Sequence, residues 1–135
     1  MPARLALAAT FVLLAVGAAS AQELVHTKDS LATVKENVQA GKGVIVDVRE
    51  PREWEAGHLK GAILAPQSKL TVEQEAKTLI QKLPKDKIIY THCRAGGRAL
   101  ACGEILKQHG FDVRPLKAGF DDLVKAGFEK AEPKP

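Results

Sequence analysis

The sequence predicts an α/β fold with a mostly parallel sheet, and three observations point to it. Short apolar or β-branched runs alternate along the chain with stretches whose apolar residues recur at helical spacing. The strand-like runs are continuously apolar, as expected of strands buried on both faces. Glycine or proline closes several of these segments. In such folds ligands bind just beyond the carboxyl ends of the strands, and Cys93 occupies such a position.

The expected elements follow one another in order. Residues 27–40 form a helix, with apolar residues at helical spacing and Gly41 as its stop. Residues 71–83 form the clearest helix, with Thr71 and Gln74 as a capping box and Val72 on the apolar face. Further helices are expected at residues 98–109 and 120–126, and a turn or one-turn helix at 51–57. Strands are expected at residues 43–48, 62–65, 87–92 and 112–116.

The first 21 residues predict a secretory signal peptide. Arg4 and the terminal amine precede an apolar run, and Ala19-Ser20-Ala21 supplies the small residues of a cleavage site. The alternative is an uncleaved membrane anchor, although the run is short for a span of about 20 residues. We expect residues 22–130 to form one domain and 131–135 a disordered tail. The expected location is periplasmic or secreted, without stable membrane association after cleavage.

Composition excludes several classes of protein. The formal net charge is only +4 and the lysines are scattered, so we expect no nucleic-acid partner. Cysteine and histidine residues do not recur at metal-ligand spacing, so we expect neither a metal nor another cofactor. There are two cysteines. Cys102 falls on the apolar face of the expected helix, which favours a core thiol over a partner for Cys93. We expect a monomer.

The segment after the third expected strand carries the chemistry. Cys93 ends the strand, where we expect its thiol to face solvent, and Arg94, Ala95, Gly96, Gly97 and Arg98 follow it. The glycines allow backbone N–H groups to converge on one point, and a helix then begins with its positive end. The two guanidinium groups add positive charge. The segment therefore favours a thiolate at Cys93 and an oxyanion, such as the sulfite end of thiosulfate, beside it.

Three motifs in order resemble the rhodanese family. Cys93 and Arg98 enclose four residues, whereas cysteine phosphatases and arsenate reductases use a loop of five. The run from Asp47 to Ala62, with Asp-Val-Arg, Trp, Gly-His and Gly-Ala, is similar to the family's first signature. Leu116-Lys117-Ala118-Gly119-Phe120 resembles its closing signature, with Ala118 where the family usually has glycine. The resemblance spans residues 24 to 128 and implies about five short strands flanked by helices on both faces.

The resemblance implies a thiosulfate sulfurtransferase that carries sulfur as a Cys93 persulfide. Arg94 would bind the donor's oxyanion, and Arg98 would close the loop and pair with a carboxylate. Residues 94–98 would form the substrate site. The implied partners are a small-molecule sulfur donor and a thiol acceptor or sulfur-carrier protein. Two alternatives stay open: a non-catalytic binding or redox-sensing module, and a cysteine phosphatase or arsenate reductase.

The resemblance also implies structural roles for the first signature. Asp47, Arg49, Glu53 and His58 would form an ion-pair and hydrogen-bond cluster that fixes the turn after the strand. His92 would point away from Cys93, because neighbouring side chains on a strand alternate. We expect Trp54 to belong to the core.

Overall fold

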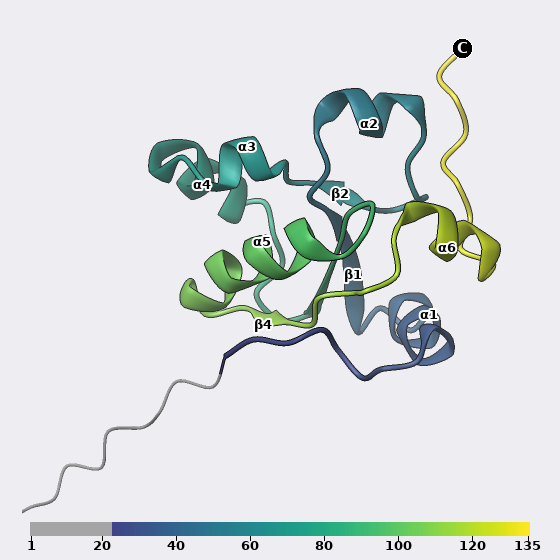
Figure 1. The fold of residues 1–135 in the computed structure, drawn as a ribbon, viewed down its shortest axis with the longest axis horizontal. Helices are drawn as coiled ribbons and strands as arrows, with labels where there is room; N and C mark the ends of the chain where they lie inside the picture. Colours follow the sequence, from purple (N-terminus) through teal and green to yellow (C-terminus); the bar gives the residue numbers. More distant parts are fainter. Residues whose placement is uncertain (1–22) are drawn as a thin grey trace, which may run out of the picture.

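The structure is a computed structural model that describes residues 23–135, and it has a parallel sheet at its centre (Figure 1). The strands lie in the order β2-β1-β3-β4, and each neighbouring pair is parallel. Their bounds are β1 Gly43–Asp47, β2 Ile63–Leu64, β3 Ile88–His92 and β4 Asp112–Val113. The predicted fold class is confirmed, with four strands in the described part of the chain where about five were expected.

Helices cover both faces of this sheet. Helices α1 (Leu31–Gln39) and α6 (Phe120–Lys125) lie on one face. Helices α3 (Gln67–Leu70), α4 (Glu73–Ile80) and α5 (Gly97–Gln108) lie on the other. The short helix α2 (Pro51–Ala56) stands beyond the carboxyl ends of the strands (Figure 1). This edge of the sheet is therefore where loops and helix ends from several elements meet.

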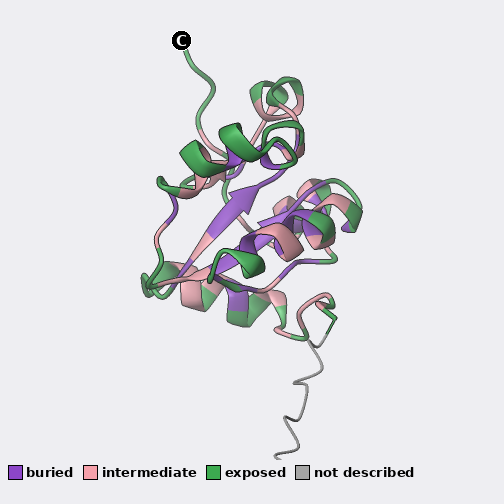
Figure 2. Ribbon diagram, turned by 90° about the vertical axis from the view of Figure 1, so that its left-hand side faces the viewer, coloured by how far each residue is buried: buried purple, intermediate pink, exposed green. Residues whose placement is uncertain are grey.

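Strands β1 and β3 each supply both cores because their side chains alternate. Ile45 and Tyr90 pack towards α1 and α6, whereas Val46 and Ile89 pack towards α5. All four side chains are almost fully buried, and Figure 2 shows the strands as the buried centre of the molecule. Burial on both faces explains why the strands read as unbroken apolar runs in the sequence.

Two helix predictions need correction. The first helix begins at Leu31 rather than at residue 27, because the Ser30 hydroxyl accepts the Thr33 N–H at 3.1 Å and caps it there. The predicted helix 71–83 is two helices instead, α3 and α4. The Thr71 hydroxyl donates to the Gln67 carbonyl at 2.9 Å, so Thr71 ends α3 and is not the cap of a capping box. Val72 precedes α4 and is 47% exposed.

Both ends of the described chain are tied to the domain. The Thr27 N–H donates to the Pro115 carbonyl at 2.8 Å, which holds residues 23–30 beside β4. At the other end, the Ala131 N–H donates to the His58 carbonyl at 2.8 Å, so pairing extends one residue into the predicted tail. The predicted signal peptide lies outside the described residues. Within 23–135, no helix has the length and apolarity needed to cross a membrane.

Candidate active site

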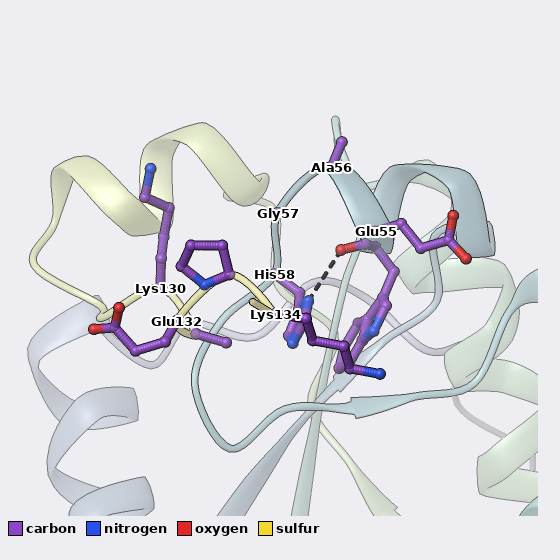
Figure 3. A pocket seen from close by; sticks show the side chains of 10 residues that line it. Glu55, Ala56, Gly57, His58, Lys130, Glu132 and Lys134 are labelled. Carbon is purple, nitrogen blue, oxygen red and sulfur yellow. Dashed lines mark hydrogen bonds between the residues drawn. The ribbon is translucent and has the colours of Figure 1, made fainter.

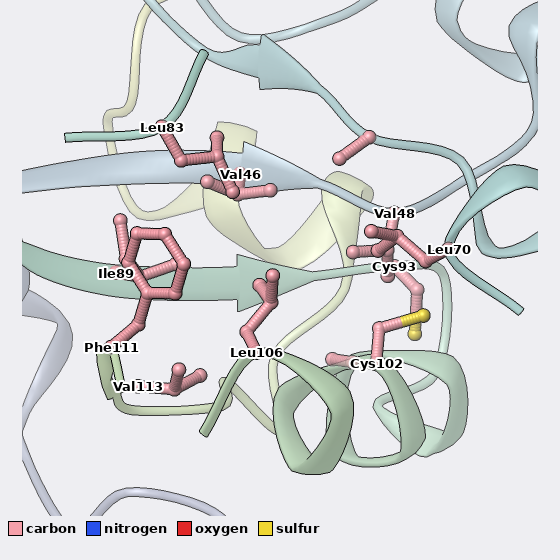
Figure 4. Close-up of a cluster of buried hydrophobic side chains, with 12 residues drawn as sticks. Val46, Val48, Leu70, Leu83, Ile89, Cys93, Cys102, Leu106, Phe111 and Val113 are labelled. Atoms are coloured by element: carbon pink, nitrogen blue, oxygen red, sulfur yellow. The ribbon is translucent and has the colours of Figure 1, made fainter. Parts of the chain in front are cut away.

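The Cys93 thiol is buried, which corrects the expectation that it faces solvent. Only 1% of Cys93 is exposed, and its side chain joins the core cluster on the α5 side of the sheet (Figure 4). The reason is strand alternation: the position directs the thiol towards Ala99 and Cys102 rather than out of the sheet edge. The loop that follows then curls back over the sulfur. The thiol is thus covered by the loop that the sequence marked as its binding site.

The backbone of this loop points a donor at the sulfur. The Gly96 N–H donates to Cys93 Sγ at 3.1 Å. Gly96 adopts φ 95°, a left-handed conformation that glycine enters without strain, and it caps the N-terminus of α5. That end of a twelve-residue helix carries partial positive charge. The amide and the helix end together favour negative charge on the sulfur.

The closing motif holds the loop from the other side. The Phe120 N–H donates to the Cys93 carbonyl at 3.0 Å. A Cβ atom on Gly119 would overlap the Arg94 carbonyl group, although the φ of Gly119 is an ordinary −87°. Gly119 is therefore needed for space rather than for its backbone angles. Ala118, which replaces the family's usual glycine, is half-buried and packs into the core beside α6.

The two arginines of the loop have different surroundings. Arg98 forms a two-point ion pair with Glu53 of α2, at 2.6 and 3.1 Å, so the expected carboxylate partner is Glu53. The hydrogen bonds from Arg98 lower the pKa of Glu53 from 4.5 to about 2, against the opposing effect of burial. Arg94 is exposed, and within residues 23–135 no side chain pairs with its guanidinium group. Ala95 and Gly97 are also exposed, whereas Gly96 is buried.

The first signature forms only part of the cluster expected of it, because Glu53 pairs with Arg98 and His58 stacks on Trp54 instead. Arg49 pairs with Asp47 at 2.8 Å, and both residues are buried. The Arg49 guanidinium also donates to the Gly57 carbonyl at 2.8 Å and lies 4.4 Å from the centre of the Phe120 ring. One arginine thus ties the end of β1 to the end of α2 and to α6. Glu53 joins α2 to the Cys93 loop.

His92 points away from Cys93, as expected, and lies beside Asp47. Its side chain is completely buried, and burial lowers the pKa of its imidazole. His92 Nε2 is 3.6 Å from Asp47 Oδ2 and has no hydrogen-bond partner among the described residues. The neutral form is therefore favoured, and the ring fills the core beneath the site.

Trp54 lines a cavity and belongs to neither core cluster. Figure 3 shows this cavity with His58 beside it. It is half-buried and stacks on His58, with ring centroids 3.6 Å apart. The two rings line a cavity of about 640 Å³ between α2 and residues 130–134. Neither Cys93 nor its loop lines this space. The cavity is therefore separate from the thiol site.

Cys102 differs from Cys93 in its surroundings. Both are free thiols, and Figure 4 shows their sulfur atoms between β3 and α5. Burial raises the pKa of Cys102 to about 12, and the nearby Cys93 adds to the rise. Cys102 therefore remains an uncharged core thiol, as its position in the sequence predicted. Within residues 23–135, no three His, Cys, Asp or Glu side chains come together in a way that would hold a metal ion.

One residue at the site escaped sequence reasoning. His26 lies 70 residues before Gly96 in the chain, yet its Nε2 is 2.8 Å from the Gly96 carbonyl oxygen. No local pattern marks His26, because the contact depends on how the segment before α1 crosses the domain. A lone histidine ahead of a helix carries no sequence signal for such a contact.

Comparisons with known proteins agree with this architecture. The family described as Rhodanese-like domain matches residues 30–126. The chain is 34% identical over 89 residues to the uncharacterized protein YqhL of Bacillus subtilis, covering 64% of this chain and 66% of that protein. It is 33% identical over 79 residues to the probable adenylyltransferase/sulfurtransferase MoeZ of Mycobacterium tuberculosis, covering 58% of this chain and 19% of that protein.

The solved structures agree as well. The crystal structure of a rhodanese-related protein from Thermoplasma volcanium matches with a TM-score of 0.62 at 24% identity, which shows a shared fold. The match covers 82% of this chain and 98% of that one. The two curated relatives are each matched over less than two thirds of their length. On the family match over residues 30–126, this chain belongs to the rhodanese-like domain family.

Proposed function

We propose that the protein is a sulfurtransferase that carries sulfane sulfur on Cys93, with thiosulfate as a donor. The observation that carries the proposal is the Gly96 N–H aimed at Cys93 Sγ at the N-terminus of α5. A thiolate and a persulfide anion both gain from such a donor. The sulfurtransferase named among the chain's relatives supports the same class of reaction.

The reaction has two balanced steps. The Cys93 thiolate attacks the outer sulfur of thiosulfate, the S–S bond of the donor breaks, and sulfite leaves with the electron pair. Cys93 then carries a persulfide whose negative charge is held by backbone N–H groups of residues 94–98. A second nucleophile attacks the terminal sulfur and restores the Cys93 thiolate, which gives ping-pong kinetics. Cyanide serves as this nucleophile in vitro, and a thiol or a sulfur-carrier protein is the natural acceptor.

The surroundings of Arg94 support a role for this residue in binding the donor. It is exposed beside the covered thiol, and its guanidinium is not engaged by another side chain of the described chain. A planar guanidinium suits an oxyanion such as the sulfonate end of thiosulfate. Arg98 is already committed to Glu53, so its part is to hold the loop shut. We therefore assign the donor's oxyanion to Arg94.

Mass spectrometry of the purified protein tests the proposal. We expect thiosulfate to add the mass of one sulfur atom to Cys93 and cyanide to remove it as thiocyanate. Cys93→Ser should lose this gain entirely. Cys102→Ala, which keeps an apolar core residue, serves as the matched cysteine control and should still load. A reduced Cys93 that never gains sulfur would rule out transfer from thiosulfate and favour a binding module.

We also propose that the protein is exported and acts in the periplasm or outside the cell. The support is the sequence of residues 1–21, with its positive start, apolar run and small residues at the expected cleavage site. The N-terminal mass of protein recovered from the producing cells tests this. Cleavage after Ala21 is expected, and a retained Met1 in a membrane fraction would contradict it.

A further inference from the structure

The segment before helix α1 reaches the Cys93 loop through one side chain, His26. We propose that His26 is a positioning residue for this loop, fixing the turn at Gly96 whose N–H points at the Cys93 sulfur. The inference rests on the proposed sulfur transfer at Cys93. His26 precedes residues 30–126, the part of the chain that matches the family. The contact therefore joins the Cys93 loop to a segment that lies ahead of the matched residues.

The contact has a definite polarity. His26 Nε2 lies 2.8 Å from the Gly96 carbonyl oxygen, and a carbonyl oxygen only accepts. Nε2 must therefore carry a hydrogen and donate it. The same oxygen also accepts the Leu100 N–H at 3.2 Å, the first hydrogen bond of α5. Two donors on one carbonyl hold the planar peptide between Gly96 and Gly97 in one orientation.

This orientation matters for the sulfur. In a trans peptide the C=O and N–H groups point in opposite directions. Holding the Gly96 carbonyl through His26 and Leu100 therefore leaves the Gly97 N–H pointing beyond the N-terminus of α5. Glycine has no side chain to restrict its backbone, so two successive glycines gain order from outside contacts. The imidazole is close enough that a Cβ on Gly96 would be 3.1 Å from Nε2. His26 thus restrains the peptide that directly follows the Gly96 N–H, which limits how far the turn at Gly96 can move away from Sγ.

His26 is held in place by contacts on both sides of it. The Leu24 N–H donates to Glu104 Oε1 at 2.8 Å, and the Thr27 N–H donates to the Pro115 carbonyl at 2.8 Å. Asp29 then accepts from Arg114 at 2.9 Å. None of these bonds uses the imidazole. Removing the ring should therefore leave the segment in place and affect the loop alone.

The first experiment compares His26→Ala and His26→Gln with His109→Ala, a matched change at an exposed histidine away from the loop. We expect His26→Ala to slow single-turnover persulfide formation about three- to tenfold, the equivalent of one ordinary hydrogen bond. His26→Gln, whose amide N–H also donates, should recover most of the rate. His109→Ala should match the wild type. Equal loss in the Ala and Gln variants, or none in either, would overturn the inference.

The second experiment does not depend on sulfur chemistry. Long-range ¹H–¹⁵N NMR of the wild type should show hydrogen on His26 Nε2, and the Gly96 amide should exchange more slowly than in His26→Ala. A neutral ring with hydrogen on Nδ1 only, or unchanged exchange at Gly96, would refute the role of His26. Because these signals exist whether or not thiosulfate reacts, failure of the proposed function and failure of this inference are told apart.

Discussion

Replacing Gly119 with alanine should damage the site more than any other one-carbon change near it. The added Cβ would overlap the Arg94 carbonyl, which is backbone and cannot swing aside as a long side chain can. Overpacking of this kind costs about 1–3 kcal/mol. Moving the two segments apart also weakens the bond from the Phe120 N–H to the Cys93 carbonyl, worth about 1 kcal/mol. The expected loss of unfolding free energy is therefore about 2–4 kcal/mol.

Gly97→Ala is the matched control for stability. Nothing lies within 4 Å of a Cβ at Gly97, and its φ is not positive. It starts helix α5, where alanine is the better residue by up to about 1 kcal/mol. The free energy of urea unfolding should therefore fall below the wild-type value in Gly119→Ala and rise above it in Gly97→Ala.

The loading assay adds a second measure of Gly119→Ala. Because the displaced segment is Arg94 in the Cys93 loop, the variant should also load sulfur more slowly where it remains folded. An unfolding free energy within about 0.5 kcal/mol of the wild type, together with normal loading, would refute the close-approach argument.

Three further changes test separate contacts. Glu53→Gln should lower the unfolding free energy by about 0.5–1 kcal/mol at pH 7, since the pair with Arg98 is partly exposed. Because the pKa of Glu53 is lowered from 4.5 to about 2, this stabilisation is complete above pH 4.5 and lost as the pH falls towards 2. The unfolding free energies of the wild type and Glu53→Gln should therefore converge near pH 2. Cys102→Ser should cost about 1–3 kcal/mol by urea unfolding, because it buries a hydroxyl among apolar groups, while Cys93 still loads sulfur; no loss of stability would contradict this placement. Tyr90→Phe removes a buried hydroxyl that donates to Asp29 at 2.8 Å, and thermal unfolding should show a loss of about 1 kcal/mol, which an unchanged Tm would exclude.

Local pattern determined the elements that carry the site. Unbroken apolar runs are found where strands are buried on both faces, and they located β1 and β3 to within a residue or two. The Cys-x4-Arg spacing located the loop before α5, because the glycines of the loop directly precede the start of the helix in the sequence. The prediction failed at residues 71–83, where Thr71 bonded to the helix before it and split one expected helix into two. A threonine at a helix boundary gives the same sequence pattern whether it ends one helix or begins the next, until its hydrogen-bond partner is known.

Contacts between distant segments were decided only by the tertiary structure. The sequence placed Cys93 at a strand end, but burial of its thiol depended on which face that position occupies and on the loop folding back over it. The need for Gly119 came from the approach of Arg94, and the contact from His26 to Gly96 came from a segment 70 residues away. The spacing of apolar residues shows which side chains share a face of one helix or strand, because these elements are built from local repeats. The packing that covers the sulfur and fixes its loop joins residues that share no repeat, so it exists only once the chain has folded.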